Sequence, residues 1–156
     1  YCVPSSNNAK PRDGLVVKEV GEAGIKNFAD LYMVYMDNLA VPQSLRRQGE
    51  ALVEAGYPRS GWRLYTVTVE GEPAAFGMLH IRDGTASMAG AATVKKYRGM
   101  GCQTALLNRR LADAAGAGCD LAVTQAIPGS VSQRNMEHVG FRIAYTKAIW
   151  SNVRAD

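Results

Sequence analysis

The feature that most constrains the fold is a change of pattern near residue 94. Before it, three segments with strand patterns, 63–70, 74–82 and 85–94, are separated only by the short turns 70–73 and 83–84. After it, residues 102–117 place apolar side chains at helical spacing. Strands joined by tight turns pair antiparallel, whereas a strand followed by a helix of this length can return parallel. This pattern therefore predicts a mixed, mostly antiparallel sheet with helices beside it.

The remaining elements follow from the same patterns of periodicity and chain breakers. We expect a first strand at 15–20, helices at 23–38 and 44–55, a short strand at 121–127, a helix from Ser130 to Val139 and a final strand at 141–150. Ser130 and Gln133 have the spacing of a capping box at the start of the last helix. The predicted order is β-α-α-β-β-β-α-β-α-β, which is an α+β fold.

Length and composition predict one domain. The chain has 156 residues, 47% of them hydrophobic, which is enough for one core, and we assign it to residues 15–156. Residues 1–14 are polar and contain proline, so we expect a flexible tail or linker. Because the chain begins with Tyr1 rather than Met, we expect a processed protein, a trimmed one or the C-terminal part of a longer chain.

Several classes of protein are disfavoured. No apolar run approaches the roughly 20 residues of a membrane helix, so we expect no membrane partner. The three cysteines, Cys2, Cys102 and Cys119, form no CxxC pair, which argues against a disulfide framework and against a metal site. Unpaired thiols are typical of a reducing compartment, so we expect a cytoplasmic protein.

The charge is uneven along the chain. The formal net charge is +4, with −1 on residues 1–78 and +5 on residues 79–156. We interpret the helix and strand cations of the second half, Arg109 and Arg110 among them, as solvated surface charges. Lys95, Lys96 and Arg98 differ, because they cluster where a helix begins. An anionic partner is expected there.

The segment between residues 93 and 107 has the features of an anion-binding loop. Gly99 and Gly101 allow positive φ angles and close approach of a ligand to the backbone. The helix that follows leaves its first N–H groups unpaired, and its dipole favours an anion. The expected occupant is a diphosphate.

Several anion-binding motifs compete for this loop. A P-loop requires Gly-Lys-Ser/Thr, but Gly101 is followed by Cys102 and Gln103. A dinucleotide fingerprint requires a small residue at Thr104 and normally opens a domain, whereas here helices and hairpins precede the loop. Nucleic-acid binding is disfavoured, because the cations interleave with glycines and not with exposed aromatic residues. A glycine turn without a ligand remains the alternative.

The loop resembles motif A of the GNAT acyltransferases, which bind acetyl-coenzyme A (acetyl-CoA). The matching residues are Arg98-x-x-Gly101-x-Gln103, followed by Thr104-Ala105-Leu106-Leu107. Gln103 stands where the motif has Gly or Ala, and Lys95 where many members have Pro. The order of elements matches the family over about residues 15–150, and the segment from Ser130 to Phe141 is similar to its fourth-helix motif.

The resemblance implies acetyl-CoA as cofactor and a set of residues that bind it. The strand before the loop offers backbone groups to the pantetheine arm, the loop amides hold the pyrophosphate, and the helix from Ser130 lines the other side. The implied cofactor-binding residues are Ala92, Thr93, Val94, Arg98, Gly99, Met100, Gly101, Cys102, Gln103, Thr104, Ser130, Ser132 and Asn135.

The family's usual set of catalytic groups is only partly present in this sequence. The Val94 N–H is the expected donor to the thioester carbonyl. Met136 stands where the family commonly has a tyrosine acid, four residues before Gly140, so the usual proton donor is missing. Tyr145 on the final strand is our expected replacement, with the hydroxyl groups of Ser130 and Ser132 or a water as alternatives.

Two further assignments concern the base and the loop thiol. No Glu or Asp occurs in residues 85–94, so the general base is a water wire or Glu50 or Glu54 of the second helix. The helix start and nearby cations are expected to lower the pKa of the Cys102 thiol. We nevertheless assign it no nucleophilic role, because direct transfer needs no acyl-enzyme.

The predicted function is an N-acetyltransferase that moves an acetyl group directly from acetyl-CoA to a primary amine of a small molecule or to an exposed amino group of a peptide. The alternative is a non-catalytic, GNAT-like domain that binds acyl-CoA or regulates a partner. We expect no nucleic-acid partner. A homodimer and a companion domain in a longer chain both remain open.

Overall fold

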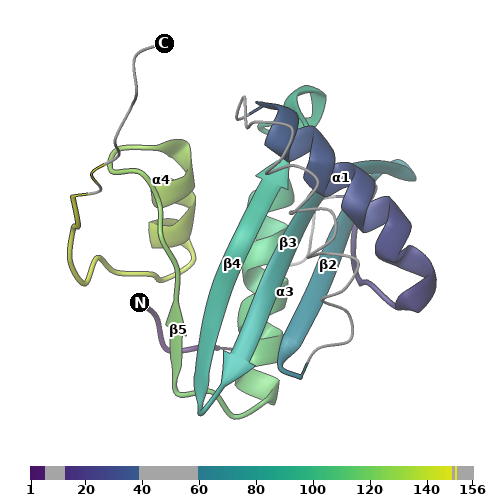
Figure 1. Ribbon diagram of the computed structural model, residues 1–156. Coiled ribbons are helices and arrows are strands. Elements are labelled where there is room, and N and C mark those ends of the chain that lie inside the picture. Colours follow the sequence, from purple (N-terminus) through teal and green to yellow (C-terminus); the bar gives the residue numbers. More distant parts are fainter. Residues whose placement is uncertain (6–12, 39–59, 149, 151–156) are drawn as a thin grey trace.

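A single five-stranded sheet forms the centre of the molecule, with helices on both faces (Figure 1). The computed structural model describes residues 1–5, 13–38, 60–148 and 150. The strand order is β1-β2-β3-β4-β5, with antiparallel pairs from β1 to β4 and a parallel β4–β5 pair. The prediction of a mixed, mostly antiparallel α+β sheet is therefore confirmed.

The element bounds follow the sequence patterns closely. The strands are β1 (Leu15–Glu19), β2 (Trp62–Val69), β3 (Glu72–Arg82), β4 (Thr85–Thr93) and β5 (Leu121–Val123). The helices are α1 (Ile25–Asn38), α3 (Cys102–Gly116) and α4 (Val131–His138), with short 3-10 turns η1 (Glu22–Gly24) and η2 (Lys95–Tyr97). The helix expected at 44–55 lies outside the described residues.

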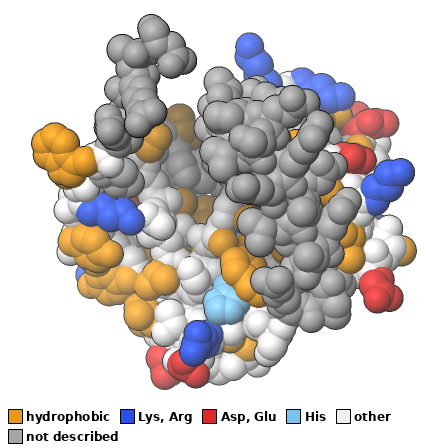
Figure 2. All heavy atoms as spheres, viewed as in Figure 1, with side chains coloured by type: hydrophobic (Ala, Val, Ile, Leu, Met, Phe, Trp, Pro, Cys, Tyr) orange, Lys and Arg blue, Asp and Glu red, His pale blue; other side chains and the backbone are white. Residues whose placement is uncertain are grey.

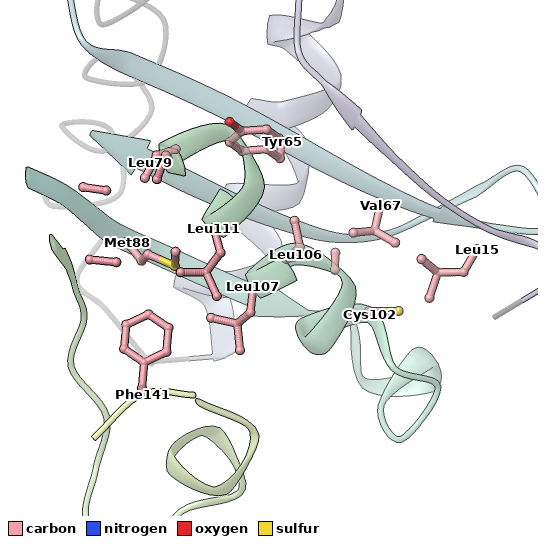
Figure 3. Packing of buried hydrophobic residues seen from close by; sticks show 14 of the residues in the cluster. Leu15, Tyr65, Val67, Leu79, Met88, Cys102, Leu106, Leu107, Leu111 and Phe141 are labelled. Carbon is pink, nitrogen blue, oxygen red and sulfur yellow. The ribbon is translucent and has the colours of Figure 1, made fainter. Parts of the chain in front are cut away.

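Two hydrophobic clusters cover the two faces of the sheet. Because side chains alternate along a strand, Leu64 of β2 packs toward α1 with Phe28 and Phe76, while its neighbour Tyr65 packs toward α3. Figure 3 shows the α3 cluster, in which Leu106, Leu107 and Leu111 of the helix meet side chains of the strands. Burial of these two faces fixes α1 and α3 on opposite sides of the sheet.

The final strand expected at 141–150 is wrong for the described part of that range, because residues 141–148 form neither helix nor strand. Phe141 is buried, but Ile143 and Tyr145 are 63% and 77% exposed. A competing segment pairs with β5: the Cys2 N–H donates to the Ala122 carbonyl at 2.8 Å, and the Ala122 N–H donates to the Cys2 carbonyl at 2.7 Å. At Ala122, the edge of β5 that faces away from β4 is thus already paired with Cys2.

A β-bulge interrupts the pairing of β3 with β4. The register shifts between Gly77 and Leu79, which leaves carbonyl groups without their regular strand partners. The Arg110 guanidinium of α3 donates to two of them, from Nη1 to the Met78 oxygen at 3.0 Å and to the Ala89 oxygen at 3.4 Å. Gly77 provides the room, since a Cβ there would lie 3.2 Å from Arg110 Cζ.

Arg110 is therefore a core residue, and the expectation of a solvated surface charge was wrong. It is 2% exposed, and no described carboxylate pairs with it. Burial lowers the pKa of its guanidinium to about 10, so the group still carries its charge at neutral pH. The sheet thus holds a positive charge that is compensated by backbone carbonyls.

Replacement of this guanidinium tests its structural role. We expect Arg110→Met to lower the free energy of unfolding by about 2–4 kcal/mol, because the change leaves the Met78 and Ala89 carbonyls without their donor. Urea denaturation of the full chain measures the effect.

Arg109 is the matched control. It pairs with Asp113 at 2.9 Å on the partly exposed side of the same helix. Arg109→Met is expected to lower the free energy of unfolding by less than about 1 kcal/mol. Equal losses for the two variants would contradict a special role for Arg110.

Candidate functional site

The glycine loop has the backbone geometry that its sequence predicts. Gly99 and Gly101 have φ angles of 79° and 89°, in the region that favours glycine. Gly101 is the N-cap of α3 and makes no side-chain capping hydrogen bond. A Cβ at either glycine would meet nothing within 4 Å, so the space in front of both residues is open.

A row of backbone donors faces this space without partners. Among the described residues, no acceptor is found for the N–H groups of Gly99, Gly101, Cys102, Gln103 and Thr104, and the first bond of the helix runs from the Ala105 N–H to the Gly101 carbonyl. Exposed N–H groups at the positive end of a helix form an anion site. The loop therefore fits a phosphate-bearing ligand.

Three cations directly precede the row of amides in the chain. Lys95, Lys96 and Arg98 are exposed, and none forms an ion pair with a carboxylate in the described part of the chain. Lys96 Nζ lies 4.6 Å from the centre of the Tyr97 ring, and Arg98 Nε donates to the Thr93 carbonyl at 3.4 Å. Their charge is thus available to an incoming anion.

The strand before the loop presents a different amide from the one that we expected. The Val94 N–H donates to the Ala74 carbonyl at 2.9 Å, so it faces β3 and is not free to polarise a thioester. Successive amides of a strand point to opposite edges. The N–H groups of Thr93 and Ala91 therefore face away from β3, toward the side where β5 runs.

The open edge of β4 leads into a cavity. β5 pairs with β4 only at residues 85–87, and beyond that point the two segments diverge. A cavity of about 400 Å³ lies there, lined by residues 88–91 of β4, residues 124–127 and side chains of α3 and α4. The helix residues in its wall include Gln103, Ser130, Ser132 and Met136. The cavity thus lies between the loop helix α3, the free amides of β4 and α4.

Gln103 connects the loop to α4. Its Nε2 donates to Ser132 Oγ at 2.7 Å, and its Oε1 accepts from Asn135 Nδ2 at 2.8 Å. Ser132 and Asn135, both implied cofactor residues, thus bind Gln103 in this structure. We call this three-residue network the Gln103 bridge. Sequence reasoning missed it, although two polar residues three positions apart on one helix face were a usable signal.

The start of α4 forms as predicted. Ser130 is the N-cap, and its Oγ accepts from the Gln133 N–H at 3.1 Å. The Gln133 side chain turns back and accepts from the Gly129 N–H at 2.6 Å, one residue earlier than in an ideal capping box. These bonds hold the first turn of α4 at the cavity.

Cys102 differs from the expectation of an acidic thiol. It is 2% exposed, and burial raises the pKa of its thiol. Loss of hydration outweighs the backbone hydrogen bond at the helix start, which lowers the pKa. Met100, another residue of this turn with an implied cofactor role, is 40% exposed. The loop thus contributes backbone amides, and its Cys102 thiol is not activated.

The expected acid and base are not brought together. Tyr145 lies in the irregular segment 141–148, is 77% exposed and does not line the cavity, whereas Met136 does. Glu50 and Glu54 lie outside the described residues. Within the described ranges there is no cluster of three or more His, Cys, Asp or Glu that could hold a metal ion.

The described part of the molecule has a second cavity and an exposed hydrophobic surface. A larger cavity of about 700 Å³ lies between residues 1–5, α3 and the end of α4, but no strand residue lines it. In the view of Figure 2, hydrophobic side chains gather on the side of the molecule where Figure 1 places α4. Among the described helices, none is long and apolar enough to cross a membrane.

Comparisons with solved structures place the fold among acetyltransferases. AAC(6')-Iy in complex with the bisubstrate analog CoA-S-monomethyl-acetylneamine is similar at a TM-score of 0.69 and 13% identity, over 90% of this chain and 99% of that one. The ribosomal-protein-alanine N-acetyltransferase of Brucella melitensis biovar Abortus 2308 is similar at a TM-score of 0.68 and 12% identity, over 88% and 98%.

A third structure extends the same group. The aminoglycoside acetyltransferase meta-AAC0020, from an uncultured soil metagenomic sample and in complex with trehalose, has a TM-score of 0.67 and 10% identity, over 93% of this chain and 99% of that one. At these identities the likeness shows the fold alone.

Sequence comparison identifies the family. No curated protein matches the sequence. The family model for the GNAT acetyltransferase domain matches residues 21–122, which include α1, β2 to β4, the glycine loop and α3 in the described part of the chain. The chain therefore belongs to the GNAT acetyltransferase family.

Proposed function

We propose that this protein transfers an acetyl group from acetyl-CoA to a primary amine of a small molecule or to an exposed amino group of a peptide. The observation that carries the proposal is the row of N–H groups at residues 99 and 101–104, which have no acceptor among the described residues. The row lies beside a cavity that follows the open edge of β4. Structures of the similar AAC(6')-Iy contain CoA or a CoA analog.

The backbone and the loop cations would hold the cofactor. The loop amides bind the diphosphate, and Lys95, Lys96 and Arg98 balance its charge. The outward amides of Ala91 and Thr93 replace Val94 as donors to the pantetheine arm and the thioester carbonyl. When bound, acetyl-CoA supplies an activated acyl group. Preorganised donors of this kind favour the oxyanion that develops during acyl transfer.

The acceptor belongs to one of two amine classes. Similar structures are named as aminoglycoside acetyltransferases and as a ribosomal-protein-alanine N-acetyltransferase. Both descriptions involve transfer to an amine, one on a small molecule and one on a protein. Free thiols such as those of the three described cysteines are typical of a reducing compartment, which supports our proposal of a cytoplasmic location.

The alternative function is a non-catalytic acyl-CoA-binding domain. One observation favours it: Met136, which cannot donate a proton, lines the cavity where many relatives carry their acid. Loss of an acid lowers a rate without abolishing transfer, because positioning of the reactants supplies part of the acceleration. We therefore keep catalysis as the main proposal.

A carboxylate placed in the loop tests the cofactor site. We expect Gly101→Glu to weaken binding of CoA at least about 100-fold, because the new charge repels the diphosphate and the side chain fills the open space. Titration calorimetry with CoA measures the loss.

Gly71→Glu is the matched control. Gly71 has a φ of 87°, and a Cβ there also meets nothing within 4 Å, but it lies in the turn between β2 and β3. The control variant carries the same strain and the same charge and should bind CoA normally. Normal binding by Gly101→Glu would refute the loop assignment.

Thiol release distinguishes the two functions. We expect acetyl-CoA to release free thiol faster than the hydrolysis background with at least one of two probe amines, sisomicin or a peptide with an N-terminal alanine. The Gly101→Glu protein should lose this signal, which controls for contaminating enzymes. Tight CoA binding without release above background for any amine in a broader panel would favour the non-catalytic alternative.

A further inference from the structure

The hydrogen bonds of Ser132 leave it with the two functions that a proton relay requires. A hydroxyl group has one hydrogen to donate and two lone pairs that accept. Gln103 Nε2 occupies one lone pair of Ser132 Oγ at 2.7 Å. No described residue accepts the Ser132 hydrogen. One donor and one acceptor therefore remain on an oxygen whose residue lines the cavity of about 400 Å³.

The Gln103 bridge fixes the orientation of this hydroxyl. Gln103 is itself held by Asn135, whose Nδ2 donates to Gln103 Oε1 at 2.8 Å, so the amide presents its N–H to Ser132. All three residues are half-buried. The bond from Gln103 selects one χ1 rotamer of Ser132, because any other χ1 rotamer would move the oxygen out of reach of Gln103.

The position of Ser132 suits the missing acid. Ser132 and Met136 are four residues apart on α4, so they lie on one helix face, and both line the cavity. Ser130 also lines it, but its oxygen is held at the N-cap by the Gln133 N–H. Tyr145 is exposed and lies outside the cavity wall.

We propose that Ser132, positioned by Gln103 and Asn135, relays a proton from the attacking amine to the departing sulfur of CoA. This inference rests on the proposed function. As the nitrogen–carbon bond forms and the carbon–sulfur bond breaks, the surplus proton on nitrogen moves to Ser132 Oγ. The hydrogen of the hydroxyl moves at the same time to sulfur. The products are the amide and the CoA thiol, and Ser132 ends neutral as it began.

A spectroscopic measurement tests this role without any acceptor amine. A hydroxyl that donates to sulfur stabilises the thiolate and so lowers the pKa of the thiol of bound CoA. We expect Ser132→Ala to raise that pKa by about one unit, which is a tenfold change in thiolate population. The measurement is the thiolate absorbance of the CoA complex as a function of pH. Subtraction of the same titration of the desulfo-CoA complex removes the signals of the protein's own tyrosines and cysteines.

Three comparison variants make the result specific. Ser132→Thr keeps the hydroxyl and should restore the wild-type thiol pKa. Gln103→Glu keeps the shape of the side chain but replaces the N–H donor by a carboxylate oxygen that accepts. This oxygen should accept the Ser132 hydrogen, which is then no longer available to the CoA sulfur. We therefore expect the thiol pKa to rise at least as far as in Ser132→Ala. Tyr145→Phe should leave it unchanged, whereas the earlier expectation for Tyr145 predicts a rise.

The outcomes separate this inference from the proposed function. If wild-type protein does not bind CoA in calorimetry, the proposed function fails and the relay fails with it. If all variants bind CoA and Ser132→Ala leaves the thiol pKa within about 0.3 units of wild type, the relay alone is overturned. A shift in Tyr145→Phe without one in Ser132→Ala would assign the role to Tyr145. With an active amine, kcat should fall about 10- to 100-fold in Ser132→Ala while the CoA dissociation constant stays nearly constant.

Discussion

The site depends on a buried charge at the bulge where β3 and β4 shift register. The Arg110 guanidinium donates to carbonyl oxygens of Met78 and Ala89 at the β-bulge, where the regular strand ladder fails. Without such a donor, the bulge would contain unpaired buried carbonyls and would be costly to keep. With it, β4 can bend while the rest of the sheet stays paired, and a cavity lies where β4 and β5 part.

Backbone and side chains have separate tasks around that cavity. The backbone supplies the donors: the amides at the start of α3 face an open space, and those of Ala91 and Thr93 face the open edge of β4. Side chains form the walls of the cavity and set the distance between α3 and α4. The Gln103 bridge holds α4 against α3 through two side-chain hydrogen bonds. These bonds link side chains of α3 and α4 directly, so they set the spacing of the two helices at the wall of the cavity.

Sequence reasoning predicted what depends on local pattern and missed what depends on competition between distant groups. The antiparallel pairing of β2, β3 and β4, the glycine loop and the Ser130 cap follow from periodicity and short-range bonds, and all three appear in the structure. The burial of Arg110 depends on a bulge that no pattern in α3 reveals. The final strand failed because Cys2, from the other end of the chain, bonds to Ala122. The Val94 amide was misassigned because alternation predicts a strand without saying which edge each amide faces.

The open cradle at the start of α3 also bears on how such a protein changes over evolutionary time. An anion site built from main-chain N–H groups places strict demands only on the residues that shape the backbone, here Gly99 and Gly101 with their positive φ angles. Neighbouring positions, such as 100 and 104, are then free to vary for other reasons, including solubility and contacts with other molecules. Recognition of the shared ligand can thus persist while the surrounding side chains drift, and new acceptor specificities can arise without rebuilding the half of the site that holds the donor.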